Sequence, residues 1–136
     1  MTVSTARQKV TTFLMFEGRA EEAITFYTSL FDDGEVLLLN RWGVDGPGKE
    51  GTVYQASFRV GGQVIKAFDS PPAHAFTFTP STSLWVECDT EAELDRLYAA
   101  LNEGGQALMP LGDYGFSTKY GWTNDRFGVS WQLNLA

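Results

Sequence analysis

The side chains that most often carry out chemistry are scarce in this sequence, which contains one cysteine and one histidine. Cys88 ends the apolar segment SLWVEC with no recognisable base near it, so we interpret it as a small buried hydrophobic residue. His74 lies in the proline-flanked segment PPAHAFTFTP, which favours a loop histidine with local hydrogen bonds over a metal ligand. Neither residue therefore predicts a nucleophile or a metal centre.

The closing segment DRFGVSWQLNLA, residues 125–136, alternates between two kinds of side chain. Its apolar side chains, expected to pack on helices, are Val129, Trp131, Leu133 and Leu135, and its polar ones are Ser130, Gln132 and Asn134. If the last hairpin pairs residue 124 with residue 128, residue 122 faces residue 130 and residue 120 faces residue 132. A slip of one residue would bring Gly121 and Thr123 to that face instead. The first register places four residues on one surface, namely Tyr120, Trp122, Ser130 and Gln132.

This surface is our candidate binding site, because apolar walls with a few directed polar groups are typical of small-molecule pockets. Tyr120 and Trp122 would supply flat walls, and Gln132 would supply a hydrogen-bond donor. A second interpretation stays open, in which both aromatic residues belong to the core. Asp125 and Gly128 are predicted to be structural, because aspartate starts many turns and glycine tolerates their backbone.

Length and charge argue against several classes of protein. The chain of 136 residues fits one compact domain, residues 1–136. A formal net charge of −7 argues against nucleic acid as a partner, because phosphate binding needs a basic surface. The longest aliphatic run, residues 36–39, is far too short to span a membrane, and MTVSTARQKV is not typical of a secretory signal. Together with the single cysteine, these features predict a cytoplasmic protein.

The elements that must position these residues follow from apolar periodicity and turn signals. The first half is predicted as strand 11–16, helix 20–31 and strands 35–42, 52–60 and 63–69, with Gly61-Gly62 as a hairpin turn. The second half is predicted as strand 83–88, a helix from residue 91 to about 103 capped by Thr90, and strands near 106–111, 117–124 and 128–135. The chain is therefore expected to form two modules, about residues 9–70 and about 80–136.

The two halves are related by a weak internal repeat. One offset between the halves places Tyr27 on Tyr98, and past the glycine-rich loop a shorter offset places Gly62 on Gly128. Each half is therefore a strand, a helix and three more strands. Two such halves predict an α+β fold, in which two βαβββ modules form a curved eight-stranded mixed sheet. The helices would cover its outer face, and its inner face would form a cup.

This order of elements resembles the vicinal oxygen chelate superfamily, which has the glyoxalase, bleomycin resistance and extradiol dioxygenase fold. More specifically, the chain resembles the PhnB-like branch, known as 3-demethylubiquinone-9 3-methyltransferase-like domains. The resemblance covers roughly residues 9–135, and its matching segments are FLMFEGRAEEAITFYTSLF and GWTNDRFGVSWQL. The pattern G-W-x-x-D-x-F-G-x-x-W-Q comprises Gly121, Trp122, Asp125, Phe127, Gly128, Trp131 and Gln132. No glycine-rich nucleotide loop follows a strand, so the residues themselves do not indicate methyl transfer.

The resemblance implies four positions at which metal-using relatives place His, Gln or Glu, two from each module. In this chain the matching positions are Thr12, Lys66, Ser83 and Gln132. A lysine ammonium has no lone pair and adds a competing positive charge, whereas divalent metals prefer imidazole or anionic oxygen. Nearby acids could substitute only in a different strand register, namely Glu17, Asp69 and Glu87. We therefore expect no bound metal and no other cofactor.

These expectations favour a metal-independent module that binds a small apolar or aromatic molecule in the cup. The expected ligand-binding residues are Thr12, Lys66, Ser83, Tyr120, Trp122, Ser130 and Gln132. One alternative is an enzyme of the same superfamily, a lyase, isomerase or transferase acting on a small carbonyl or aromatic substrate. It would use Lys66 as its catalytic base or nucleophile, or an unrecognised metal. A second alternative is a purely structural domain.

The expected partners are the small-molecule ligand and a second copy of the chain, with no nucleic acid and no membrane. Open sheet edges need covering, and members of the superfamily that the chain resembles are usually homodimers, sometimes with modules exchanged between chains. We therefore expect a homodimer with twice the 15.1 kDa mass of one chain.

Overall fold

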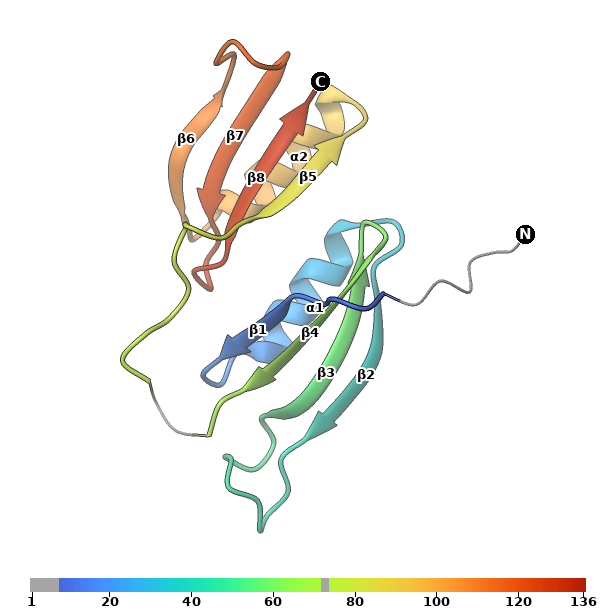
Figure 1. Ribbon diagram of the computed structural model, residues 1–136, viewed down its shortest axis with the longest axis vertical. Coiled ribbons are helices and arrows are strands. Elements are labelled where there is room, and N and C mark those ends of the chain that lie inside the picture. The colour runs from blue at the N-terminus through green and yellow to red at the C-terminus, as the bar shows by residue number, and fades with distance from the viewer. Residues whose placement is uncertain (1–7, 72–73) are drawn as a thin grey trace, which may run out of the picture. The chain divides into compact units, whose positions relative to one another are not determined.

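The computed structural model describes residues 8–71 and 74–136. The chain divides into two compact units that meet in the sequence between Ala75 and Phe76. Each unit has its own helix and its own sheet (Figure 1). Both units are βαβββ modules, as the sequence predicts.

The first module contains one helix and a four-stranded sheet. Along the chain its elements are β1 (Phe13–Phe16), α1 (Ala20–Leu30), β2 (Glu35–Arg41), β3 (Val53–Val60) and β4 (Gln63–Asp69). In the sheet the order is β1-β4-β3-β2, with β1 parallel to β4 and the other neighbours antiparallel. Strand β4 therefore lies inside the sheet, and β2 forms one of its edges.

The second module repeats this arrangement. Its elements are β5 (Leu84–Cys88), α2 (Glu91–Asn102), β6 (Gln106–Gly112), β7 (Lys119–Asn124) and β8 (Ser130–Leu135). The sheet order is β5-β8-β7-β6, again with one parallel pair, β5 and β8. Strand β8, which carries Gln132, is therefore flanked by strands on both sides.

The predicted α+β class and both βαβββ modules are confirmed, and the predicted bounds agree with the observed ones to within two residues. The hydrogen bonding between strands divides them into two four-stranded sheets, where the sequence suggested one sheet of eight. The last strand of each module finds both of its neighbours within that module.

The internal repeat extends to an irregularity in the strand pairing. In each module the strand after the helix carries a β-bulge, at Leu37 in β2 and at Leu108 in β6, where one residue has no partner of its own. The two bulges are related by the same offset that places Tyr27 on Tyr98. The shorter offset of the last strands also holds. The residue after each bulge pairs with a residue of the next strand, and that residue pairs in turn with Lys66 in the first module and with Gln132 in the second.

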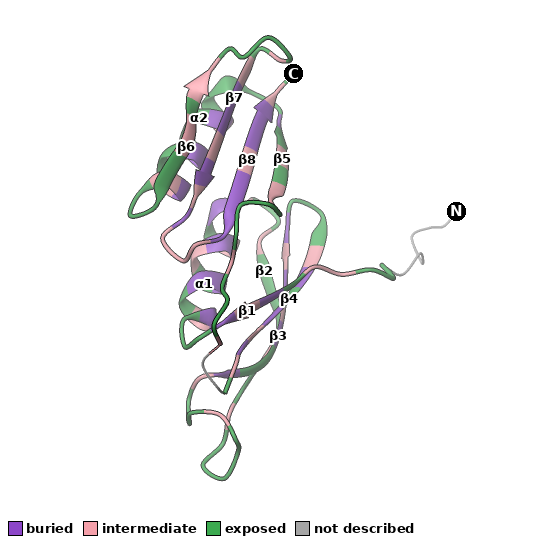
Figure 2. Ribbon diagram, turned by 60° about the vertical axis from the view of Figure 1, so that its left-hand side comes forward, coloured by how far each residue is buried: buried purple, intermediate pink, exposed green. Residues whose placement is uncertain are grey.

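Each sheet buries the face that packs on its own helix, and we call the other side of each sheet its open face. In the first module the buried side chains include Ala23, Ile24 and Tyr27 of α1 with Ala56, Phe58, Ile65 and Ala67 of the sheet. In the second module they include Leu94, Leu97 and Leu101 of α2 with Trp131 and Leu133 of β8 and Val129 just before it. Figure 2 shows buried residues along β7 and β8, whereas the edge strand β6 has none. The predicted burial of Val129, Trp131 and Leu133 is confirmed.

The two helices begin in different ways. Thr90 caps α2 as predicted, because its hydroxyl accepts a hydrogen bond of 3.1 Å from the N–H of Glu93. The residue before α1 supplies no such cap. Instead, buried Asp69 at the end of β4 accepts hydrogen bonds from the N–H groups of Gly18 and Ala20, at 2.7 and 3.0 Å. Its second oxygen accepts one of 2.8 Å from the first residue of β3. One carboxylate thus joins three segments of the first module.

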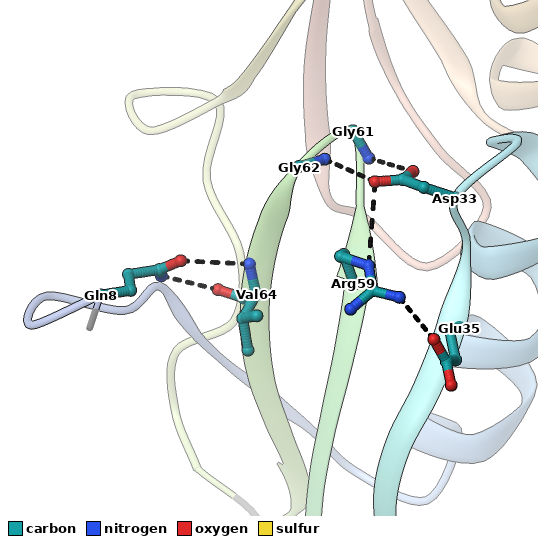
Figure 3. A network of polar contacts seen from close by, with 7 residues as sticks. All are labelled: Gln8, Asp33, Glu35, Arg59, Gly61, Gly62 and Val64. Carbon is teal, nitrogen blue, oxygen red and sulfur yellow. Dashed lines mark hydrogen bonds and ion pairs between the residues drawn. The ribbon is translucent and has the colours of Figure 1, made fainter. Parts of the chain in front are cut away.

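The β3–β4 hairpin is fastened to the loop after α1 (Figure 3). Gly61 and Gly62 both have positive φ, 57° and 84°, as two-residue hairpin turns require. The carboxylate of Asp33 accepts hydrogen bonds from both glycine N–H groups, at 2.8 and 2.7 Å. These bonds, the one from Gly62 first, lower the pKa of Asp33. Arg59 lies beside Asp33 and forms an ion pair with Glu35. The predicted glycine turn is therefore confirmed by its backbone angles, and charged side chains hold it in place.

A side chain extends the pairing of β4 beyond the end of β1. The amide of Gln8 donates a hydrogen bond of 2.9 Å to the carbonyl of Val64 and accepts one of 3.2 Å from its N–H (Figure 3). A neighbouring peptide group would make the same two bonds, so Gln8 acts as a short continuation of the strand.

Candidate ligand-binding site

The last hairpin places the predicted site residues on one face, although its register differs from the predicted one. Trp122 lies opposite Gln132, and Tyr120 lies opposite Asn134. We expected residue 122 opposite 130 and residue 120 opposite 132, so that prediction was wrong by two residues. Because side chains alternate with a period of two, a shift of two leaves every side chain on its expected face. Tyr120, Trp122 and Gln132 therefore still share the open face of the sheet.

The turn at Asp125 explains the shifted register. Asp125 pairs with Val129 through a backbone bond of 2.8 Å, so the turn closes one residue later at each end than we predicted. Its carboxylate accepts hydrogen bonds from the N–H groups of Phe127 and Val129, at 2.8 and 3.0 Å, and from Nε1 of Trp131, at 2.9 Å. Gly128 has a φ of 90°. The predicted structural role of Asp125 and Gly128 is confirmed.

Five predicted site residues form a chain of hydrogen bonds, which we call the Gln132 network: Tyr120, Gln132, Ser83, Ser130 and Trp122. The hydroxyl of Tyr120 donates a short hydrogen bond to Oε1 of Gln132. Nε2 of Gln132 donates to the hydroxyl of Ser83 at 3.1 Å, and Ser83 shares a hydrogen bond of 2.7 Å with Ser130. Nε1 of Trp122 donates to Ser130 at 2.8 Å. All five lie in the second module.

The Gln132 network explains why an amide suits this position. Its oxygen accepts from Tyr120 while its nitrogen donates to Ser83, and a carboxylate could not donate. The network uses one of the two amide hydrogens of Gln132. It also needs only one of the two hydroxyl hydrogens of the serine pair, Ser83 and Ser130. One amide hydrogen and one hydroxyl hydrogen therefore remain that could form hydrogen bonds with a ligand.

Aromatic rings surround the phenol of Tyr120, which is 3% exposed. Its ring centroid lies 5.8 Å from those of Trp85 and Tyr114 and 4.9 Å from that of Phe116. Burial, followed by the nearby Tyr114, raises the pKa of Tyr120, so its hydroxyl stays a neutral donor. Tyr120 is therefore a core aromatic residue that positions Gln132, whereas Trp122 and Gln132 remain partly exposed.

Three further residues of this face were not among the predicted site residues. Trp85 lies directly opposite Gln132 in the β5–β8 pairing and is 47% exposed. Asn134 donates a hydrogen bond of 2.9 Å to Glu87, and this bond, with one from Trp85, lowers the pKa of Glu87. All three continue the two-residue alternation of Ser83 and Gln132, which was the signal that could have found them.

In the first module, Lys66 occupies the place that Gln132 has in the second. Its neighbours across the sheet are Phe13 on β1 and Ser57 on β3. Thr12 precedes β1, and its carbonyl accepts a hydrogen bond of 2.9 Å from the backbone of Lys66. The strand pairing makes Phe13 equivalent to Trp85, so the match of Thr12 with Ser83 is wrong by one residue.

Three of the residues that carry potential metal ligands are committed to other partners, and a fourth is buried. Asp69 binds backbone N–H groups, and Glu17 accepts a hydrogen bond of 3.2 Å from the backbone of His74. His74 also shares a hydrogen bond of 2.8 Å with Ser70, as expected of a loop histidine with local partners. Cys88 is buried as predicted, and burial raises the pKa of its thiol to about 11.

The four positions implied by the family resemblance do not suit a divalent cation. The oxygen of Gln132 accepts from Tyr120, the hydroxyl of Ser83 is bound by Gln132 and Ser130, and the ammonium of Lys66 has no lone pair. Within residues 8–71 and 74–136, no group of three or more His, Cys, Asp or Glu side chains is arranged to hold a metal ion. The donor chemistry therefore offers neither imidazole nor free anionic oxygen at these positions.

None of the helices in the described part of the chain is long and apolar enough to cross a membrane.

Comparison with known proteins agrees with the fold and the motif. A model of the 3-demethylubiquinone-9 3-methyltransferase family matches residues 8–134. A PhnB protein from Bacillus cereus, whose name carries the same methyltransferase description, is 57% identical with a TM-score of 0.93, covering 95% of this chain and 100% of its own. A protein from Pseudomonas aeruginosa is 30% identical with a TM-score of 0.82, covering 95% and 98%.

A more distant structure extends the likeness of fold. A glyoxylase/bleomycin resistance protein/dioxygenase domain from Frankia is 16% identical with a TM-score of 0.67, covering 96% of this chain and 93% of its own. Among functionally curated proteins, none matches the chain. The chain belongs to the 3-demethylubiquinone-9 3-methyltransferase family, is PhnB-like, and has the fold of the glyoxalase/bleomycin resistance/dioxygenase domains.

Proposed function

We propose that this PhnB-like domain binds a small, mainly apolar or aromatic molecule without a catalytic metal. The observation that carries the proposal is the Gln132 network, which holds an amide and two hydroxyl groups in fixed positions on the open face of the second module. The rings of Trp122, which belongs to the network, and of Trp85, which lies opposite Gln132, are partly exposed. Apolar surface with a few oriented polar groups is the usual composition of a small-molecule site.

The same network supports binding of an uncharged ligand. Gln132, Ser83 and Ser130 carry no charge, and each already has a hydrogen-bond partner in the module. A ligand can therefore accept hydrogen bonds from the remaining amide and hydroxyl hydrogens, and no charged group has to lose its hydration. A hydroxyl or carbonyl oxygen on a flat apolar body matches this surface.

The proposal assigns no methyl transfer to the chain. Nucleotides are typically held by glycine-rich loops between a strand and a helix. Here the two strand–helix connections are short, Glu17–Arg19 in the first module and Asp89-Thr90 in the second, and contain one glycine between them.

Indole signals in nitrogen-15 NMR offer a direct test. We expect titration with 2-naphthol, a neutral aromatic alcohol, to shift the indole signals of Trp122 and Trp85 saturably. Trp131 and Trp42 are internal controls, because their indole N–H groups are bound to Asp125 and to the carbonyl of Asp69. Gln132→Leu should abolish the shifts. An absence of saturable shifts at Trp122 and Trp85 would contradict the proposal and favour a purely structural domain.

The alternative enzyme has one supporting observation, because Lys66 lines a depression of about 220 Å³ on the open face of the first module. In that reaction the amine of Lys66 would attack a carbonyl carbon, and loss of water would leave an imine. Borohydride would reduce the imine to a stable amine that mass spectrometry detects. Equal trapping of a carbonyl compound such as benzaldehyde by wild type and Lys66→Ala would rule out this use of the lysine.

We also propose that the chain forms a homodimer through β2. Three apolar side chains of this edge strand, Val36, Leu37 and Leu38, are 43%, 43% and 39% exposed. If antiparallel pairing of β2 with a second copy is centred on Leu38, Glu35 of one copy lies opposite Arg41 of the other, so opposite charges face each other across the interface. Light scattering at micromolar concentration should give twice the 15.1 kDa chain mass, and Leu37→Lys should give the monomer. A wild-type monomer would contradict this proposal.

A further inference from the structure

We propose that the first module carries a subsite for the carboxylate of a small apolar acid, with the Lys66 ammonium as its anchor. This inference adds a ligand class to the proposed function. It rests on that function only for the premise that the domain takes up small molecules, because its residues lie outside the Gln132 network.

The subsite is a depression of about 220 Å³ to which all four strands of the first module contribute. Its lining includes Phe13 of β1, Leu38 of β2, Tyr54 and Ser57 of β3, and Lys66 and Phe68 of β4. The rings of Phe13 and Phe68 lie 5.3 Å apart and are tilted by 39°. A space of this size, with aromatic walls, suits a ligand of about one ring.

The charge of Lys66 has no counterpart in its surroundings. Several other basic side chains of the chain are paired with carboxylates, such as Arg41 with Glu21 at 2.5 Å and Lys119 with Asp95 at 2.8 Å. In the described ranges, 8–71 and 74–136, Lys66 has no ion-pair partner. The residues that line the depression include no aspartate or glutamate. An anion placed there would therefore meet one unopposed positive charge.

The surroundings of Lys66 select among anions. An ammonium donates up to three hydrogen bonds, and Ser57, directly opposite in the sheet, places a hydroxyl donor beside it. One carboxylate can use both donors while its apolar body contacts Phe13 and Phe68. A phosphate or a dicarboxylate would carry a second charge into the aromatic walls, where burial without a partner is unfavourable. The depression therefore favours a monocarboxylate.

This role excludes the imine-forming alternative at the same residue. A lysine that is paired with a carboxylate remains protonated and has no lone pair with which to attack a carbonyl. The net charge of −7 also disfavours non-specific uptake of anions, so binding of an acid would report on the local cation.

Titration with benzoate, followed through backbone amide signals in NMR, tests the subsite. We expect saturable shifts at Phe13, Ser57 and Lys66, and weaker binding of benzamide, which has the same shape without the charge. Lys66→Met should weaken benzoate binding about tenfold or more, because a hydrogen bond to a charged group is lost. Lys66→Arg should retain most of the affinity. Lys9→Met is the matched control, because Lys9 is exposed and lies outside the depression.

The outcomes separate this inference from the proposed function. Equal affinities for benzoate and benzamide, or equal benzoate binding by wild type and Lys66→Met, would overturn it. Benzoate shifts confined to the indole groups of Trp122 and Trp85 would overturn it as well, while leaving the proposed function intact. Benzoate shifts at β1, β3 and β4 without any 2-naphthol response in the second module would support it and contradict the Gln132 proposal.

Discussion

The two modules share a backbone plan but differ at the position where each last strand crosses the middle of its open face. In the second module, Gln132 is held by Tyr120 and Ser83, and its polar groups are oriented before any ligand arrives. In the first module, Lys66 is exposed, lacks an ion-pair partner in the described residues and is bordered by phenylalanine rings. A single fold unit thus carries a hydrogen-bonded set of neutral side chains in one copy and an exposed lysine in an aromatic-lined depression in the other.

The difference teaches that the repeat preserves the frame and leaves the chemistry free to change. The bulges at Leu37 and Leu108 and the equivalent pairing of Lys66 and Gln132 belong to the frame. The side chains next to these last-strand residues are not preserved between the modules. Phe13 lies where the second module has Trp85, and Ser57 lies where it has Trp122. The four predictions below test how far this division holds.

The largest expected effect comes from the two buried carboxylates, one in each module. Asp69 accepts three backbone hydrogen bonds, and Asp125 accepts two backbone bonds and one from an indole. Replacing either by alanine leaves three donors unpaired, two of them buried, so we expect each variant to lose about 3 kcal/mol or more of unfolding free energy. Urea denaturation measures the loss. Asp45→Ala, at an exposed aspartate, should change it by less than about 0.5 kcal/mol. Equal small effects would mean that neither carboxylate supports its module.

The second prediction compares the two equivalent positions directly. Gln132→Leu removes the partner of Tyr120 and of Ser83 on a partly buried face, so we expect a loss of about 2 kcal/mol. Lys66→Met removes an exposed charge and should stay within about 0.5 kcal/mol of wild type. Urea denaturation of both variants gives the contrast. A loss for Lys66→Met as large as that for Gln132→Leu would end the distinction between a rigid and an open site.

The third prediction concerns the donor that orients Gln132. Tyr120→Phe keeps the ring contacts with Trp85 and Phe116 and removes only the hydroxyl. We expect a loss of about 1 kcal/mol, the net value of a typical hydrogen bond, together with weaker 2-naphthol binding at Trp122. Tyr114→Phe serves as the control, because its hydroxyl bonds to the carbonyl of Pro110 and not to Gln132. Unchanged 2-naphthol affinity in Tyr120→Phe would show that the phenol does not prepare the site.

The smallest effect is a pH dependence confined to the first module. The backbone bonds from Gly62 and Gly61 lower the pKa of Asp33 in the folded state, so its contribution to stability is present above the unfolded carboxyl pKa. This contribution is lost as the pH falls through the lowered value. Wild type should therefore exceed Asp33→Asn in urea midpoint at pH 6.5, and the gap should shrink at pH 3. A gap that widens in acid would contradict this sign.

Most of the frame was predictable from local sequence signals. Helix bounds followed from the apolar face of α1 and from the cap at Thr90, and the glycine pair Gly61-Gly62 marked the β3–β4 turn. The internal repeat then supported the order of strands and helix along the chain in both modules. These features depend on residues that are close together in the sequence, so they can be predicted from the sequence alone.

The error in the last hairpin arose where one side chain decides the geometry. The carboxylate of Asp125 binds two backbone N–H groups and so sets where the last turn closes, which moved the register by two residues. Sequence spacing alone does not contain that information. The faces survived the error only because the shift was even.

The error at Thr12 has a different origin, in the connection between the first strand and the helix of each module. This connection is Glu17–Arg19 in the first module and Asp89-Thr90 in the second, so it is one residue shorter in the second. The offset that aligns the helices therefore does not align β1 with β5. Trp85 was missed for a simpler reason, because the alternation was followed along the last strand and not along its neighbour.

The paired bulges at Leu37 and Leu108 have a consequence for recombining the two halves. A bulge reverses the face of the sheet that the following side chains occupy. Exchanging segments between strands with bulges at different positions would therefore move buried side chains to the exposed face. Here both bulges lie at equivalent positions, so residues 20–38 can be exchanged for residues 91–109 with each side chain keeping its face. We therefore expect a chimera with two copies of either helix–strand unit to keep the strand faces of the natural protein, because the two bulges lie at equivalent positions.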